Sequence, residues 1–332
     1  METSLSLKDD LLNVAAYYAR DAQDLCSDVS AMAFPSGYMA PSEEMLASVA
    51  SKMRALISGI ENSITGATDQ SQIAHPQSWK LLSSSGFLRE AGLVDFILAR
   101  FAEDRLNARI ASQSEVPLLE QLPARLLSDS DPVIAEAAQT ILMSEAAARR
   151  SPRSLYRQLS PEILHQLVWR IVAALQIVSG ARNDDHTQAA KSLLSMHEEL
   201  QTGRVAARKI IHFTGVTLGD QAMDPQQAGL AIFIAAVSSR TGLDQDHILR
   251  LSDGHSSTPL AVILRACSID RDAAMAVICL FKRFTLTPYE ITLFNNSYNE
   301  LSIENAQIAI DGWCTDRLQY ISFPDLTIAA GK

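Results

Sequence analysis

The chain has 332 residues, of which 47% are hydrophobic and 20% are charged, and its formal net charge is −10 at pH 7. This composition is typical of a folded protein with a sizeable core and excludes a largely disordered chain. The acidic balance disfavours non-specific binding to nucleic acid or to an anionic membrane, because both depend on Lys and Arg. We therefore expect neither among the partners.

No segment predicts export or membrane insertion. The first residues, METSLSLKDD, lack the basic and apolar regions of a signal peptide. The most apolar run, residues 228–237, is shorter than the roughly 20 residues that span a bilayer. The cysteines are widely spaced and form no CxxC pair, so we interpret them as reduced packing residues: Cys26, Cys267, Cys279 and Cys314. These features together predict a cytoplasmic protein.

Helical periodicity recurs along the N-terminal half, and no stretch of the chain shows the sustained alternation of a strand. The predicted helices are, in order, a segment around residues 11–16, one from residues 41–44 to about Ile60, one from Arg89 past Phe101, and a helix–turn–helix pair over Leu122–Leu142. The spacing i, i+3, i+4, i+7 predicts one buried helical face of Val94, Ile97, Leu98 and Phe101.

The pair over residues 122–142 resembles a single HEAT-type unit, in which an Asp-Pro turn joins two helices. Asp131 is placed to cap the second helix and Pro132 to begin it. The residues that carry the resemblance are Leu126, Leu127, Asp129, Asp131, Pro132, Ile134, Ala138 and Leu142. Ala135 stands where the family usually has a basic residue. One unit cannot bury its own apolar face, so the resemblance implies stacking on further helices.

A short basic break over residues 146–158 marks the predicted boundary between two helical parts. After it, Ser160 and Pro161 begin a helix that Gly180 ends. Its predicted buried side is Leu164, Leu167, Val168, Ile171, Leu175 and Val178. A weaker helix reaches Leu200, and another covers residues 203–213. We predict an N-terminal part over residues 1–150, a C-terminal part over 151–321 and a loose tail over 322–332.

Helix signals are most consistent between residues 224 and 284. Asp224 and Pro225 predict the start of one helix that continues to Gly242, and Asp244 starts a short helix that ends near Leu251. Thr258, Asp270 and Thr287 predict the starts of the three helices that follow. A last amphipathic helix covers residues 303–318 and includes Trp313.

Residues 229–281 are similar to the C-terminal part of a bacterial, all-helical family that is described only as a domain of unknown function. The similarity rests on apolar and turn positions and on one Arg-Ala pair: Phe233, Gly242, Leu243, Ile248, Leu249, Leu260, Ala261, Arg265, Ala266, Asp270 and Arg271. The resemblance implies a partly HEAT-like cytosolic protein and brings no activity with it. The loop SDGHSST over residues 252–258 departs from the Gly-rich acidic loop of the family.

Motifs for common enzyme chemistries are absent from the sequence. There is no GxSxG, no GxxxxGK[ST] and no GxGxxG, so α/β-hydrolase, P-loop and Rossmann readings lack their minimum signal. The adjacent His-Asp pair of metal-dependent phosphohydrolases is also absent. We therefore expect no cofactor.

Two groups of residues suggest a binding function. His247, His255 and Asp253 are candidate metal ligands together with Asp244 and Asp246, whereas the simpler interpretation is a polar loop with helix-capping aspartates. The second group is the basic run Arg149, Arg150, Arg153 and Arg157, to which Arg204, Arg208 and Lys209 could add. This run could bind an acidic or phosphorylated partner, and the simpler interpretation is a solvated surface.

A helix-turn-helix DNA reader over residues 244–265 is disfavoured, because its second helix would present residues 260–264, Leu-Ala-Val-Ile-Leu, to the DNA. The sequence therefore predicts an all-α protein with irregular HEAT-like helical repeats, or α-solenoid, and a C-terminal helical bundle. The predicted function is a protein-interaction or regulatory scaffold module. The alternative is a small-molecule or metal-dependent enzyme with a site between the two halves.

Overall fold

The computed structural model describes residues 11–12, 14–16, 43–66, 76–114, 116–150, 152–180, 184–197, 202–282 and 285–313. The side chains of residues 148–150, 152, 153 and 216 are outside this description. Within these ranges the chain is α-helix, short 3₁₀ helix and connections, with no strand, so the predicted all-α class is confirmed. None of the described helices combines the length and the apolar character needed to cross a membrane.

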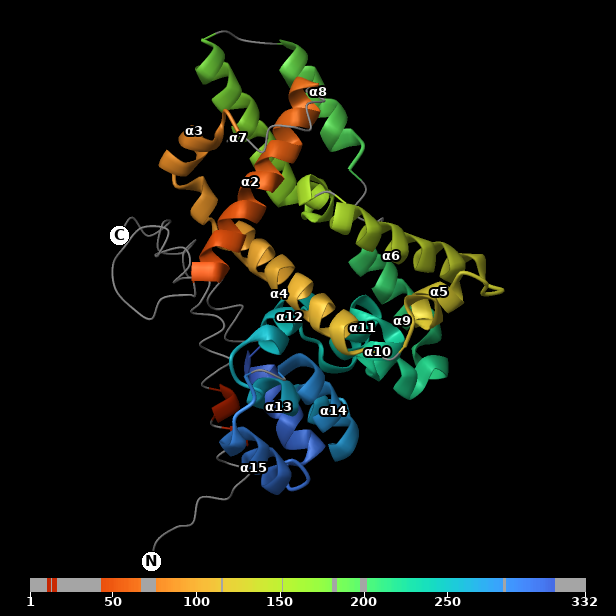
Figure 1. The fold of residues 1–332 in the computed structure, drawn as a ribbon. Helices are drawn as coiled ribbons and strands as arrows, with labels where there is room; N and C mark the ends of the chain where they lie inside the picture. Colours follow the sequence, from red (N-terminus) through yellow and green to blue (C-terminus); the bar gives the residue numbers. More distant parts are fainter. Residues whose placement is uncertain are drawn as a thin grey trace, which may run out of the picture.

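Figure 1 shows the order of the elements along the chain. In the first half they are α2 (Glu43–Thr65), α3 (Trp79–Ser84), η1 (Phe87–Arg89), α4 (Ala91–Gln113), η2 (Leu118–Glu120), α5 (Leu122–Leu126) and α6 (Pro132–Arg150). In the second half they are η3 (Pro152–Gln158), α7 (Pro161–Ser179), α8 (Asp184–Ser195), α9 (Gly203–Leu218), η5 (Gly219–Met223), α10 (Pro225–Ala228), α11 (Leu230–Thr241), α12 (Gln245–Asp253), α13 (Thr258–Ala266), α14 (Arg271–Lys282) and α15 (Pro288–Ser297).

Buried apolar side chains form two clusters. The α2–α7 cluster combines α2, α3, η1, the first part of α4, η3, α7 and α8. The α11–α13 cluster combines the rest of α4 with α5, α6, α9 and the helices from α10 onward, and it includes Leu11 and Trp313. Figure 1 shows α4 running from the region of α2 and α3 toward α11 and α12. Helix α4 is therefore shared: Ile97 and Leu98 lie in one cluster, and Leu106 and Ile110 lie in the other.

Both clusters draw on segments before and after residue 150. The division at residue 150 and the tail beyond residue 321 stay predictions, and the tail lies outside the described residues.

Several predicted helix starts are confirmed by their capping hydrogen bonds. Asp131 Oδ1 accepts from Val133 N at 2.8 Å at the start of α6. Thr287 and Glu290 form both halves of the capping box that begins α15. Gly180 ends α7 in the left-handed region, with φ 67°. Each of these residues satisfies backbone groups that a helix end leaves without a partner, which is why its position predicts the boundary.

The structure corrects two details of the helix predictions. Residues 225–241 are two helices, because Gly229, with φ 73° and ψ 156°, separates α10 from α11. A residue with a β-carbon rarely adopts that backbone conformation. The second correction concerns Val178, which was predicted to be buried and is 51% exposed beside Ile177 at the end of α7. The predicted core position of residues 260–264 is confirmed, since all of them are buried in the α11–α13 cluster.

Candidate functional site

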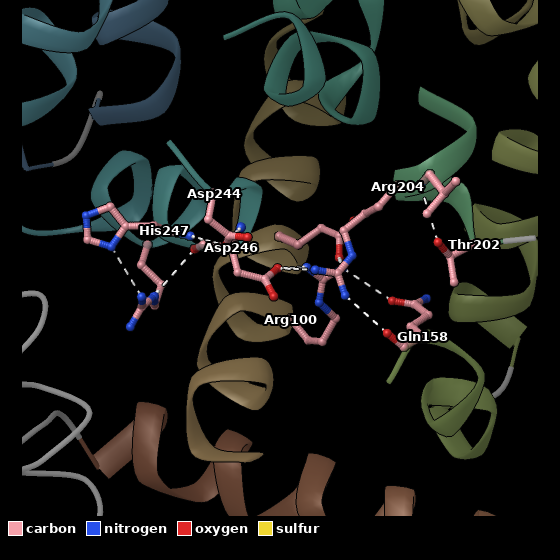
Figure 2. A network of polar contacts seen from close by, with 10 residues as sticks. Arg100, Gln158, Thr202, Arg204, Asp244, Asp246 and His247 are labelled. Atoms are coloured by element: carbon pink, nitrogen blue, oxygen red, sulfur yellow. Dashed lines mark hydrogen bonds and ion pairs between the residues drawn. The ribbon is translucent and has the colours of Figure 1, made fainter. Parts of the chain in front are cut away.

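A network of charged side chains lies where α4, α9 and α12 meet, and Figure 2 shows it from close by. Its centre is Asp246, on the first turn of α12. Arg100 of α4 donates from Nη2 to Asp246 Oδ1 at 2.6 Å, and Arg204 of α9 donates to the same oxygen. Arg100 also pairs with Glu103 one turn further along α4. The network thus joins the helix that the two clusters share to two helices of the C-terminal half.

The last residue of η3 completes the network. Gln158 Oε1 accepts from Arg100 Nη1 at 3.3 Å, and the Gln158 carbonyl oxygen accepts from Arg204 Nη2 at 3.2 Å. Because Gln158 contacts both arginines, it links the position of η3 to the ion pairs.

Because burial removes these groups from water, the pKa of each one depends strongly on the charges of its partners. Arg100 is 2% exposed. Burial alone would raise the pKa of Asp246, but Arg100 and Arg204 outweigh it, so that the pKa lies below its usual value. Burial alone would lower the pKa of Arg100, but Glu103 and Asp246 outweigh it and raise the pKa. Both groups therefore stay ionised at neutral pH, and Asp246 is unsuited to proton transfer.

A second set of contacts holds α12 against α4. Arg250 pairs with Asp95 of α4, and its Nη2 lies 3.3 Å from His247 Nδ1. Asp244 Oδ1 accepts from the backbone amides of Asp246 at 2.9 Å and of His247 at 3.3 Å, so it caps α12 as predicted. Asp244 therefore has a structural role at this helix start.

A cavity of about 620 Å³ opens beside the network. Its charged and amide lining consists of Asp95, Gln158, Arg204, Arg208, Asp244, Gln245, Asp246 and Arg250. The first turns of α4, α7, α9 and α12 all contribute lining residues. The size lies within the range of small-molecule sites in proteins, and the lining is more polar than is usual for them.

The loop over residues 252–258 is held by two buried charged side chains. Glu290 Oε1 accepts from Ser256 Oγ at 2.9 Å and from Ser257 N at 2.7 Å. Lys282, at the end of α14, donates to the Gly254 carbonyl oxygen. Asp253 lies 3.0 Å from Arg109 of α4. These contacts give the loop a structural explanation that the sequence did not reveal.

The candidate metal ligands do not come together as a site. His247 contacts Arg250, which pairs with Asp95 of α4, whereas Asp253 pairs with Arg109 further along α4. Burial raises the pKa of Asp253, while Arg105, Arg109 and Lys282, and to a smaller extent His255, lower it. Across the described ranges, no group of three or more His, Cys, Asp or Glu side chains is arranged to hold a metal ion.

The predicted basic run lies at the end of α6 and along η3. The backbone places Arg149 and Arg150 in the last turn of α6 and Arg153 in η3, while their side chains are outside the description. Arg157 is exposed and lies over the ring of Tyr156, with 6.0 Å between its guanidinium carbon and the ring centroid.

A groove of about 480 Å³ lies beside η3, between α6 and the end of α8. On α6 it is lined by Thr140, Met143, Ser144 and Ala147, which share one helical face at i, i+3, i+4 and i+7. Arg157 and Met196 line its other sides. Met143 is 64% exposed and Met196 is 72% exposed, so the groove presents apolar surface to solvent.

The cysteines have different environments. Cys267 is buried, and this burial raises the pKa of its thiol to about 12, which fits the predicted packing role. Cys279 is exposed, so the packing interpretation is wrong for it. Cys26 and Cys314 lie outside the described residues.

The sequence reasoning did not find Arg100, although a signal for it exists. Arg100 lies three residues after Ile97, which places it at the edge of the predicted buried face of α4, and four residues after Phe96, which is also buried. An arginine at such a position needs a buried acceptor. Asp246 was singled out from the sequence as a possible metal ligand, and its contacts are with arginines.

Comparison with protein-family models, with curated proteins and with solved structures found no match. The resemblance of residues 229–281 to the bacterial family therefore stays a prediction.

Proposed function

We propose that the chain is a protein-interaction module that binds an acidic helical segment of a partner in the groove between α6, η3 and α8. The observation that carries the proposal is the pair of exposed methionines, Met143 and Met196, on a groove that Arg157 also lines. Methionine is flexible and polarisable, so it adapts to apolar side chains of different shape and is common at binding surfaces.

Charge complementarity selects the kind of partner. Arg157 lines the groove, and Arg149, Arg150 and Arg153 lie in the adjoining segment of the chain. A partner helix with apolar residues on one face and Asp or Glu beside them fits both features of the surface. Within an acidic protein, a basic segment of the chain next to the groove also directs such a partner to this place.

The helical-repeat prediction supports the same proposal. We infer that α5 and α6 form one HEAT-like unit, stacked on α9, which packs along α6. Stacked helix pairs expose extended surfaces without needing a catalytic centre. Regular repetition beyond this unit, as in an α-solenoid, is part of the proposal.

The alternative function, an enzyme with a site between the two halves, draws support from the polar cavity. Its lining residues come from both sides of residue 150. The chemistry of that lining favours binding over catalysis, because Asp246 and Asp95 are paired with arginines. The two cavity serines are also engaged: Ser160 caps α7, and Ser238 donates to the Leu243 carbonyl oxygen at 2.7 Å.

Photo-crosslinking tests the interaction proposal. A photoreactive phenylalanine analogue at Met143 should crosslink a partner in cells that express the protein, whereas the same residue at Ile308, which is 61% exposed and does not line the groove, should not. Arg157→Glu should abolish the crosslink, and Arg271→Glu, at another exposed arginine, should leave it intact. Equal labelling from positions 143 and 308, or no labelling from either, would refute the proposal.

A further inference from the structure

The polar cavity beside the Arg100–Asp246–Arg204 network carries an inference that is independent of the groove. Four helices begin at its wall, and each of them is long enough to have a substantial dipole: α4, α7, α9 and α12. The N-terminal end of a helix carries a partial positive charge of roughly half a proton charge. The cavity is therefore electrostatically more favourable to an anion than its side chains alone suggest.

The backbone amides in the first turn of α4 are available as hydrogen-bond donors. Helices α7, α9 and α12 are capped by side chains, namely Ser160, Thr202 and Asp244. Helix α4 begins after Glu90, whose side chain makes no capping hydrogen bond. Ala91 and Gly92, its first two residues, line the cavity. Amides in the first turn of a helix have no acceptor within the helix, so a ligand can supply one.

A buried amide without a partner is an independent sign of a ligand. Gln245 lines the cavity and is 7% exposed. Its Nε2 is buried and has no hydrogen-bond partner among the described residues. Leaving such a group unsatisfied costs about 1–3 kcal/mol, so a native structure normally provides an acceptor. An oxygen of a bound molecule would be that acceptor.

Among the charged side chains that line the cavity, one arginine makes no ion pair in the described part of the chain and is available to a ligand. The three carboxylates are already engaged: Asp95 pairs with Arg250, Asp246 lies between Arg100 and Arg204, and Asp244 caps α12. Arg208 lies one turn after Arg204 on α9, lines the cavity and is exposed. It makes no ion pair or hydrogen bond within the described part of the chain. A guanidinium group matches the geometry of a phosphate, with which it forms two parallel hydrogen bonds.

We propose that this cavity binds a phosphate-bearing small molecule, with Arg208 on the phosphate and with Gln245 and the first turn of α4 as further donors to the same ligand. A volume of about 620 Å³ exceeds the needs of a free ion and suits a metabolite-sized phosphomonoester. Gln158 and Thr202 line both this cavity and the groove beside α6, so the ligand would lie next to the proposed partner site.

The test uses the full chain and two defined probes. Inorganic phosphate should raise the melting temperature above that in chloride at equal ionic strength, because a ligand of the native state stabilises it. A phosphomonoester such as glucose 6-phosphate should bind more tightly than inorganic phosphate, while glucose should not bind. Calorimetric titration then gives the affinities for the variants.

Two neighbouring residues on α9 supply a matched pair of variants. Arg208 and Lys209 are both exposed, but only Arg208 lines the cavity. Arg208→Gln should weaken phosphate binding at least tenfold, and Lys209→Gln, with the same change in charge, should change it less than twofold. Gln245→Met, which keeps the bulk and removes the donor, should also weaken binding. Equal losses in the two α9 variants, or no stabilisation of the wild type beyond that in chloride, would overturn the proposal.

Discussion

Replacing Lys282 with methionine should remove a pH dependence of stability that the wild-type protein has between pH 7 and pH 9. Lys282 is 1% exposed, and its ammonium group donates to the Gly254 carbonyl oxygen. Burial, and then the nearby Arg109, lower its pKa from 10.5 to about 7 against the opposing effect of Asp253. Glu290 raises this pKa and Arg105 lowers it, both with smaller effects.

The sign and size of the effect follow from this shift. Between the folded-state pKa of about 7 and the unfolded value of 10.5, the unfolded chain binds more protons at Lys282 than the folded chain does. Stability therefore rises with pH across that window, by at most about 1.4 kcal/mol per pH unit. From pH 7 to pH 9 the contribution of Lys282 is at most about 2–3 kcal/mol. Above pH 9 the raised pKa values of the buried Cys267 and Tyr298 act in the opposite direction.

Urea unfolding at pH 7, 8 and 9 measures this contribution. With Trp79 and Trp169 replaced by phenylalanine, Trp313 remains as the reporter of the α11–α13 cluster, because the chain has three tryptophans. The stability difference between Lys282→Met and the parent should be largest at pH 7 and should shrink toward pH 9. A difference that stays constant over this range would refute the assigned pKa shift.

Two further substitutions test the structural core of the candidate site and the break after α10. Asp246→Asn removes the carboxylate that Arg100 and Arg204 share and should cost about 3–5 kcal/mol in urea unfolding. Asp272→Asn, at an exposed ion pair, should cost under about 1 kcal/mol. Similar losses in the two variants would contradict the burial of the Arg100–Asp246 pair. Gly229→Ala places a β-carbon at φ 73° and should lower the free energy of unfolding by about 1–3 kcal/mol. Gly312→Ala, with open space around it, should be neutral or stabilising. A Gly229→Ala variant as stable as the wild type would show that the break between α10 and α11 needs no glycine.

Local signals in the sequence predict most helix boundaries in this fold. Thr287 with Glu290, and Asp131 with Pro132, succeed because a cap and the amides it satisfies lie within a few residues of each other. The break at Gly229 was not predicted, because the apolar pattern is compatible with one continuous helix, whereas the backbone at Gly229 has a non-helical conformation.

The candidate site is less predictable, because its partners are distant in sequence. Arg100 and Asp246 are 146 residues apart, and no local spacing relates them. The same holds for Glu290 and Ser257, whose contact explains a loop that the sequence left open as a possible functional element. Periodicity predicts which side of a helix is buried, but the pairing of two buried charges depends on how the helices pack.

The sharing of α4 between the two clusters has a consequence during synthesis. A ribosome that adds about 5–20 residues per second needs about 7–30 s to proceed from Arg100 to Asp246, which is 146 residues later. Throughout that interval Leu106 and Ile110 lack the helices of their cluster from α12 onward, and Arg100 has Glu103 but not Asp246 as a carboxylate partner. The nascent chain thus exposes an apolar helix face with a charge in it, a surface that chaperones bind and that aggregation begins from.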